Sequence, residues 1–284
     1  MAQTSSSILN QAVNLAPKAK RGDVQRYVLD IQTVLLDDVG TPKHLKHDWL
    51  GYSQLCLANG PDTGITYQVT IDSFSVGQKL TFDMKDMGRA NADQFTGKTF
   101  SYTVKQSFPV EDGCYGFRID FPKGQQFSQS YEMQEYFTIL SLLEQLRYTS
   151  GRRLAKVGDQ VSIKPPNPIC YSIPQVVVDT ETKLSTITLT LEGFSLYRGE
   201  PCAIIDITPL FAQTGVKFIQ PDTTDYWFRG ILSRSGKFQV RLSDGDIVSA
   251  VIRDRIDSKM VPDPDAERPR TSKVFRTITL NQLF

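Results

Sequence analysis

Histidine and tryptophan are scarce in this chain, and long apolar runs are missing from it. Its 284 residues include only two histidines and two tryptophans. No apolar run approaches the roughly 20 residues that a membrane-spanning helix needs, so we expect no integral membrane segment. Lysine plus arginine (32) nearly balance aspartate plus glutamate (31), which gives a net charge of +1. Because no global positive field would concentrate the chain on phosphate backbones, we expect no nucleic-acid partner.

The four cysteines are widely spaced and form no Cys-x-x-Cys pair, which argues against a zinc knuckle or a thioredoxin-type motif. They are Cys56, Cys114, Cys170 and Cys202. In an oxidising compartment they allow two disulfides with three possible connectivities. In a reducing compartment they are small buried apolar residues. The spacing leaves both interpretations open.

Short runs of alternating apolar and polar residues make up most of the chain, and glycine and aspartate turns join them. Residues 27–35 are rich in β-branched side chains, which favours a strand. Residues 66–73 alternate cleanly and place Tyr67, Val69 and Ile71 on one face. Three further runs continue the pattern: residues 79–83, 99–104 and 115–121. The first half is therefore predicted to be an antiparallel meander.

One amphipathic helix is predicted over residues 131–148. Ser128 or Ser130 can cap its start, and Gly151 can supply the left-handed residue that ends it. Its apolar side chains need a partner, and the face of a neighbouring sheet is the obvious one. These side chains recur at spacings of three and four: Met133, Tyr136, Phe137, Leu140, Leu143 and Leu146.

Proline marks a boundary between two halves of the chain. Residues 164–174 contain Pro165, Pro166 and Pro168. Proline this dense interrupts both helix and sheet, so we interpret the segment as a connector. The predicted organisation has four parts: a flexible N-terminal segment over residues 1–22, a β-rich lobe over 23–163, the connector, and a β-meander lobe over 175–284.

The second half is predicted to be β again. Residues 185–191 alternate and are expected to pair with residues 203–207 across a turn at 197–200. Three further strands follow, separated by turns at Ser235-Gly236 and Asp244-Gly245: residues 225–233, 237–242 and 246–253. A final strand over 273–280 is expected to return to an earlier edge. The fold class is therefore mainly β (α+β), with two antiparallel curved-sheet lobes and one major amphipathic helix; whether the halves are a duplication stays open.

No catalytic motif accompanies this pattern. Gly97-Lys98-Thr99 is similar to the end of a phosphate-binding loop, but Ala92 stands where such a loop needs glycine. Residues 51–55 and 193–197 both lack the closing glycine of a serine-hydrolase elbow. We therefore expect no enzyme. An acidic cluster keeps a hydrolase open as an alternative to a solvated loop: Asp83, Asp86 and Asp93.

His44 and His47 hold all the histidine of the chain and are three residues apart. On a helical turn both rings would face the same way and could ligate a metal together with Asp48. The neighbouring Lys43 and Lys46 disfavour a cation, and a solvated basic turn is the simpler interpretation. We expect no metal and no cofactor, with these two histidines as the candidate ligands if a metal is bound.

Phenylalanine and tyrosine, 16 and 11 residues, supply most of the aromatic content. Many of them fall at inward-facing strand positions, where they would bury large apolar areas in an ordinary sheet core. Alternatively, a concave sheet closed by the helix leaves an apolar cleft that could hold an acyl chain. The candidate cleft residues lie on the predicted helix: Tyr136, Phe137, Leu140 and Leu143.

Three segments resemble the strand-turn-strand pattern of bacterial cell-envelope β-proteins. They are residues 156–159 (KVGD), 228–231 (FRGI) and 243–250 (SDGDIVSA). The families in question are two-lobed uncharacterised envelope proteins and half-barrel lipoprotein carriers related to LolA. The chain departs from the carriers because it has no lipobox cysteine at its start. The resemblance implies a periplasmic or surface-exposed binding protein without catalysis.

These observations lead to one principal hypothesis and two alternatives. The principal one is a non-catalytic envelope or secreted binding protein for an apolar or extended ligand. The first alternative is a structural or assembly protein that docks protein partners through sheet edges. The second is a hydrolase that uses the acidic cluster. A periplasmic or secreted location is expected, although the small polar residues 1–7 also suit a cytoplasmic protein.

Overall fold

The structure of the protein is a computed structural model that describes the following parts of the chain. The described residues are 12–36, 40–60, 64–80, 95–104, 136, 139–140, 143–144, 146–147, 151, 153–163, 177–219, 226–261 and 270–283.

Eleven strands form one sheet, and every pair in it is antiparallel. In chain order they are β1 (Val24–Leu36), β2 (Pro42–Gly60), β3 (Gly64–Leu80), β4 (Thr99–Val104), β5 (Gln160–Ile163), β6 (Val177–Leu184), β7 (Ile187–Tyr197), β8 (Glu200–Ile219), β9 (Tyr226–Arg241), β10 (Ile247–Val261) and β11 (Arg270–Leu283). Their order in the sheet is β4-β3-β2-β1-β11-β10-β9-β8-β7-β5, and β6 also pairs with β8.

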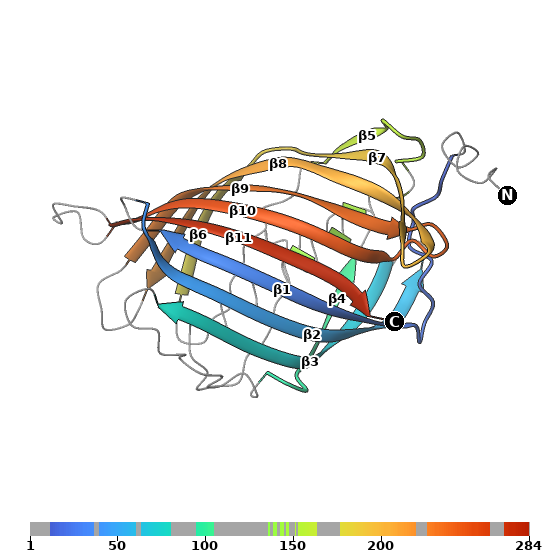
Figure 1. Ribbon diagram of the computed structural model, residues 1–284, viewed down its shortest axis with the longest axis horizontal. Coiled ribbons are helices and arrows are strands. Elements are labelled where there is room, and N and C mark those ends of the chain that lie inside the picture. Colours follow the sequence, from blue (N-terminus) through green and yellow to red (C-terminus); the bar gives the residue numbers. More distant parts are fainter. Residues whose placement is uncertain are drawn as a thin grey trace.

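The first and last strands lie side by side in the middle of the sheet (Figure 1). β1 pairs with β11 from Arg26↔Leu283 to Leu36↔Lys273. The final strand does return to an earlier strand, but not to an edge as predicted, because β1 also pairs with β2. The mainly β, antiparallel character of the fold is confirmed. Because β11 also pairs with β10, the sheet continues from the first half of the chain into the second. Two separate lobes are not confirmed.

The sheet is curved, and its concave side holds the core (Figure 1). Alternation within β1 shows why: Tyr27, Leu29 and Ile31 are at most 2 % exposed, whereas Val24, on the other face, is 57 % exposed. A strand with one apolar face gains free energy by burying that face, at about 25 cal/mol per Å² of apolar surface. The inner faces of β1 to β3 and of β7 to β11 contribute to one apolar cluster.

Helical residues lie against this concave side. The described ones are all buried: Tyr136, Ile139, Leu140, Leu143, Glu144, Leu146 and Arg147. Their spacing agrees with the predicted apolar stripe. The helix is predicted over residues 131–148, and its other residues lie outside the described ones. The helix as a whole therefore stays a prediction.

Strand β8 pairs along one edge with β7 and then with β6, and a proline separates the two pairings. Pro209 has no backbone N–H to give to the ladder. The side chain of Thr208 replaces the missing link: the backbone N–H of Thr188 donates to Thr208 Oγ1 at 3.0 Å, and this hydroxyl donates to the carbonyl of Thr188 at 3.0 Å. The ladder thus continues across the interruption.

The predicted hairpin at residues 197–200 is confirmed. Tyr197 pairs with Glu200, and Arg198 and Gly199 between them have φ values of 51° and 86°. Two successive residues with positive φ match the right-handed twist of the flanking strands. The predicted turn at Asp244-Gly245 also lies between strands, with φ of 76° at the glycine.

The predicted turn at Ser235-Gly236 is wrong, because β9 runs through it from Tyr226 to Arg241. Gly236 is needed there for close packing instead. A Cβ atom on Gly236 would lie 2.3 Å from the backbone oxygen of Val251 and 2.7 Å from Cδ1 of Ile252 on β10. The glycine therefore permits two strands to approach and does not mark a chain reversal.

Part of the predicted flexible N-terminal segment lies against the body of the molecule. The backbone N–H of Leu15 donates to the carbonyl of Gly151 at 2.9 Å, and that of Lys18 to Asp244 at 2.8 Å. Leu15 is 1 % exposed and belongs to the core. Residues 1–11 and the predicted connector, 164–174, lie outside the described residues. The domain boundaries therefore stay a prediction.

Candidate functional site

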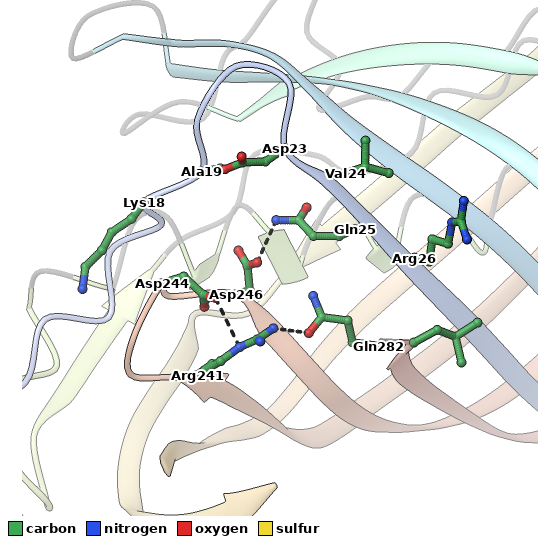
Figure 2. A pocket seen from close by; sticks show the side chains of 11 residues that line it. Lys18, Ala19, Asp23, Val24, Gln25, Arg26, Arg241, Asp244, Asp246 and Gln282 are labelled. Carbon is green, nitrogen blue, oxygen red and sulfur yellow. Dashed lines mark hydrogen bonds and ion pairs between the residues drawn. The ribbon is translucent and has the colours of Figure 1, made fainter. Parts of the chain in front are cut away.

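A polar pocket of about 540 Å³ lies at one end of the sheet, where β1 begins, β11 ends and a turn joins β9 to β10 (Figure 2). This volume is in the range of small-molecule sites in proteins. Charged side chains line it in equal numbers of each sign: Lys18, Arg26, Arg241, Asp23, Asp244 and Asp246.

Two buried amides come from neighbouring strands that otherwise present apolar residues on the same face. Gln25 of β1 is 8 % exposed and Gln282 of β11 is 4 % exposed. The amide of Gln25 donates to Asp246 Oδ2 at 2.7 Å. The turn before β10 holds Asp246 in place, because the backbone N–H of Asp246 donates to Asp244 Oδ1 at 2.9 Å.

Arg241, at the end of β9, contacts three side chains from other parts of the chain. Its Nη1 lies 3.1 Å from a carboxylate oxygen of Glu200, which begins β8, and its Nε lies 3.3 Å from Asp244 Oδ2 in the turn. Its Nη2 donates to the side-chain oxygen of Gln282. A guanidinium held by three groups is fixed in orientation, so the wall is ordered in advance of binding.

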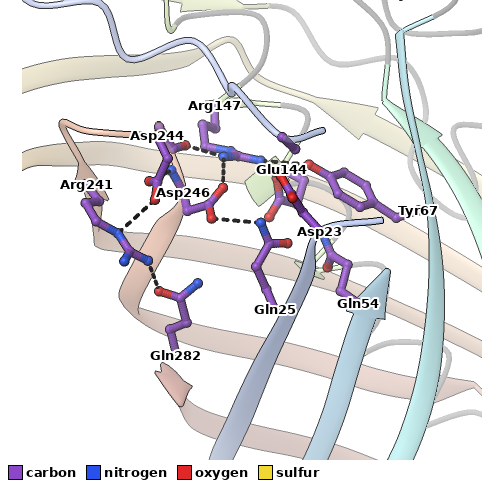
Figure 3. Close-up of polar contacts among 12 residues, drawn as sticks. Asp23, Gln25, Gln54, Tyr67, Glu144, Arg147, Arg241, Asp244, Asp246 and Gln282 are labelled. Atoms are coloured by element: carbon purple, nitrogen blue, oxygen red, sulfur yellow. Dashed lines mark hydrogen bonds and ion pairs between the residues drawn. The ribbon is translucent and has the colours of Figure 1, made fainter. Parts of the chain in front are cut away.

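A buried ionic cluster lies directly behind the pocket (Figure 3). Its centre is Arg147, which is 2 % exposed. Arg147 Nη1 is 3.5 Å from Asp246 Oδ1 and also donates to the carbonyl of Gly245. Its Nη2 pairs with Glu144 and donates to the hydroxyl of Tyr67 on β3 at 3.3 Å. The cluster therefore links the helical residues, the pocket wall and a distant strand.

The two carboxylates of this cluster share one guanidinium, and both have raised pKa values. Burial is the main cause for Asp246; Arg147 opposes it and Asp244 adds to it. Burial also raises the pKa of Glu144, again against the opposing effect of Arg147. Removing a carboxylate from water disfavours its charged form. Asp246 therefore accepts a proton more readily than a solvated aspartate does.

The pocket can act as a site for hydrogen bonding and ion pairing. Lys18 and Arg26 offer donors at its mouth, whereas Asp23 and Asp246 offer acceptors. No serine, cysteine or histidine is among the residues that line it. In the part of the chain that the structure describes, no three potential metal-ligating side chains come together.

Three of the four sequence-predicted cleft residues are described, and these three lie in the apolar core. Tyr136, Leu140 and Leu143 are 2 %, 6 % and 3 % exposed, and Phe137 lies outside the described residues. The hydroxyl of Tyr136 donates to Asp48 Oδ2 on β2 at 2.6 Å. The role of these four residues in ligand binding stays a prediction.

His44 and His47 both lie on strand β2, so the helical turn on which they could share a metal does not form. Successive side chains of a strand point to opposite faces, so residues three apart cannot face the same way. His47 Nε2 is 2.8 Å from Asp30 Oδ1, and its ring lies 3.7 Å from that of Trp49. Partial burial lowers the pKa of His44, and the positive charge of Lys46 lowers it further. The two rings therefore point to opposite faces of β2, and a metal role for His44 and His47 stays a prediction.

Cys56 and Cys202 are free and buried, which agrees with the interpretation of the cysteines as small core residues. Burial raises the pKa of both thiols, so both are weak nucleophiles. Cys114 and Cys170 both lie outside the described residues, so a disulfide between them stays a prediction. The acidic cluster of Asp83, Asp86 and Asp93 also lies outside them.

The sequence analysis missed the polar pocket, although one signal for it was present. Gln25 is in phase with the buried Tyr27 and Leu29 of β1, and Gln282 is in phase with the buried Ile278 and Leu280 of β11. A glutamine at an inward position of an apolar strand needs a polar partner. That signal could have indicated a polar site, but it could not have named Asp246 as the partner.

Comparisons with known proteins show no family for this chain. No protein-family model matches it, and no curated protein does. Two solved structures of OmpT, an outer membrane protein of Vibrio cholerae folded in vitro, have 9 % identity to it. For the first structure, the alignment covers 94 % of this chain and 99 % of the OmpT chain, with a TM-score of 0.21. For the trimer form, it covers 93 % of this chain and 100 % of the OmpT chain, with a TM-score of 0.19. Values this low carry no conclusion. Within the described ranges, no helix is long and apolar enough to cross a membrane.

Proposed function

We propose that the protein is a non-catalytic binding protein, located in the cell envelope or secreted, whose ligand occupies the polar pocket at the end of the sheet. The observation that carries the proposal is the pocket itself, a space of about 540 Å³ walled by three basic and three acidic side chains. Such a lining suits a polar ligand with both donors and acceptors, such as a sugar or a zwitterion.

Preorganisation of the wall supports a binding role. Arg241, Gln25 and Asp246 are each held by protein partners, so a ligand would meet groups that are already oriented. Preorganised groups lose little conformational entropy when a ligand arrives. The envelope or secreted location is drawn from the sequence resemblance.

An apolar ligand on the concave side has less support. The cleft candidates that the structure describes are at most 6 % exposed and pack with the apolar cluster. A ligand there would have to displace side chains that already fill the space, and interiors are packed nearly as densely as organic crystals.

The test is a binding screen against a panel of free amino acids and small saccharides, read by thermal shift and then by calorimetry. We expect at least one of them to bind with micromolar to millimolar affinity. Gln25→Ala with Gln282→Ala should weaken binding by about tenfold, because each removes a hydrogen-bonding group from the wall. The matched control is Gln213→Ala, which truncates an exposed glutamine on β8.

Two results would contradict the proposal. One is a panel in which no compound binds, together with purified protein whose native mass spectrum shows no bound small molecule. The other is a spectrum that shows a bound lipid, which would move the site to the concave side and restore the apolar ligand.

A further inference from the structure

The outward face of β9, β10 and β11 carries a cluster of basic side chains where β10 ends and β11 begins, away from the pocket. Figure 1 shows the course of these three strands. Cross-strand partners in an antiparallel sheet share a face, and neighbouring strands are only about 4.8 Å apart. Four successive rows therefore lie together on this face: Arg229–Lys259–Thr271, Ile231–Asp257–Lys273, Ser233–Arg255–Phe275 and Ser235–Arg253–Thr277.

These rows point outward, because the alternate residues of the same strands are buried. The positions that alternate with the outward residues include Asp254, Arg276 and Ile252, which are 3 %, 6 % and 2 % exposed. All the basic residues of the four rows are exposed. The outer basic patch consists of four cations and three apolar side chains: Arg253, Arg255, Lys259, Lys273, Phe211, Ile231 and Phe275.

Positive charge in the outer basic patch is only partly balanced. Asp257 is the one carboxylate in the four described rows, and it pairs with Arg255 at 2.9 Å. Arg253, Lys259 and Lys273 make no ion pair with any described residue. The whole chain has a net charge of only +1, so this local excess is a property of the fold and is hidden in the composition.

Apolar side chains are exposed among these cations. Phe211 is 54 % exposed, Ile231 is 53 % exposed and Phe275 is 39 % exposed. Phe211 and Phe275 lie in the same row, on either side of Ser233 and Arg255. Exposed apolar residues surrounded by polar ones mark interaction surfaces.

We propose that the outer basic patch docks the protein reversibly on a membrane surface that contains anionic lipid. Unpaired lysine and arginine side chains attract anionic headgroups, and the exposed phenylalanine and isoleucine side chains can enter the boundary with the acyl chains. Nucleic acid fits less well, because an aliphatic side chain such as Ile231 gains little from phosphates or stacked bases. The docking needs no membrane-spanning segment and does not depend on the polar pocket.

The test measures binding of the full chain to vesicles by sedimentation. One set is pure phosphatidylcholine and the other contains phosphatidylglycerol as well. We expect binding only to the anionic vesicles, weakening as salt is raised. The triple variant Arg253→Gln, Lys259→Gln, Lys273→Gln should lower the partition coefficient about 100-fold, since each cation near an anionic surface contributes roughly fivefold.

The matched control removes three exposed cations elsewhere: Lys20→Gln, Arg153→Gln, Lys156→Gln. It has the same net charge as the triple variant and should keep nearly all of the binding. A second pair, Phe211→Ser with Ile231→Ser, should reduce binding by about tenfold or more even in high salt, because the lost contribution is apolar. Leu196→Ser, at a side chain that is 73 % exposed, is its control.

Three outcomes would overturn the proposal. The first is equal binding to both kinds of vesicle, or to neither. The second is an equal loss in the triple variant and its charge-matched control, which would show a general charge effect. The third is binding of a short DNA duplex, lost in the triple variant, without binding to anionic vesicles, which would assign the patch to nucleic acid.

Discussion

Two buried aspartates, Asp254 on β10 and Asp246 in the turn before it, have pKa values shifted in opposite directions. Burial alone would raise the pKa of Asp254, but Arg234 and Arg276 act against it and hold the pKa well below its usual range. Arg234 Nε lies 2.7 Å from Asp254 Oδ1, and Arg276 Nη2 lies 2.6 Å from Oδ2. Burial raises the pKa of Asp246, and Arg147, which Asp246 shares with Glu144, lowers it by less than burial raises it. The number of cations for each buried carboxylate thus decides the sign.

The raised pKa of Asp246 predicts how stability depends on pH. A carboxyl whose pKa is higher in the folded state binds more protons there, so stability falls as pH rises from the unfolded pKa, about 3.9, through the raised folded value. Asp246→Asn removes this titration. Above about pH 4, the free energy of unfolding of this variant should therefore fall less steeply with pH than that of the unmodified chain. The two slopes should differ by up to about 1.4 kcal/mol per pH unit.

Urea unfolding at several pH values between 4 and 8 measures this dependence. Asp72→Asn replaces an exposed carboxylate on β3 and serves as the control, with a slope like that of the unmodified chain. A slope that is the same or steeper in Asp246→Asn would contradict the assigned shift.

At the scale of elements, clean alternation predicts strands well, whereas glycine dipeptides are ambiguous. The strand at residues 66–73 is part of β3, and the hairpin at Arg198-Gly199 forms as predicted. Ser235-Gly236 has the same appearance in the sequence but lies inside β9. A glycine that permits close packing cannot be told from a turn glycine without knowledge of the neighbouring strand.

This distinction is testable at Gly236. A Cβ atom there would meet the backbone of β10 at 2.3 Å, so Gly236→Ala should destabilise the fold by about 2–3 kcal/mol, the usual cost of overpacking or more. Gly193→Ala is the control, because a Cβ at that position on β7 meets nothing within 4 Å. Chemical unfolding gives both values. Equal effects of the two substitutions would mean that β9 and β10 do not approach closely at Gly236.

At the scale of the whole molecule, the pairing of β1 with β11 joins the two halves of the chain into one sheet. The main apolar cluster contains residues from both halves, such as Leu29 of β1 and Phe238 of β9. Neither half can bury its inner face completely without the other. The outer basic patch and the polar pocket lie at opposite ends of the same three strands, β9 to β11.

We therefore expect one cooperative unfolding transition. Urea unfolding followed by far-ultraviolet circular dichroism and by tryptophan fluorescence should give coincident curves. Deletion of residues 270–284 removes β11 and should abolish the transition, since the sheet would be divided. Two well-separated transitions would instead support the two lobes that the sequence predicts.

The sequence by itself determined, for the segments with clean alternation, that they are extended and which face of each is apolar. Side-chain alternation is a local property, and burial of Tyr67 and Ile71 on one face follows from it directly. The helical spacing of Tyr136, Leu140 and Leu143 likewise indicated their common buried side. β2 was missed because its lysines and histidines hide the alternation.

Only the tertiary structure decided which strands are neighbours, and with them both proposed surfaces. Gln25 and Asp246 are hydrogen-bonded although 221 positions separate them, and the cations of the outer basic patch come from two strands, β10 and β11. Strand order and register depend on the packing of all inner faces together, which no local pattern encodes. A side chain's partners across a sheet are therefore a property of the folded molecule.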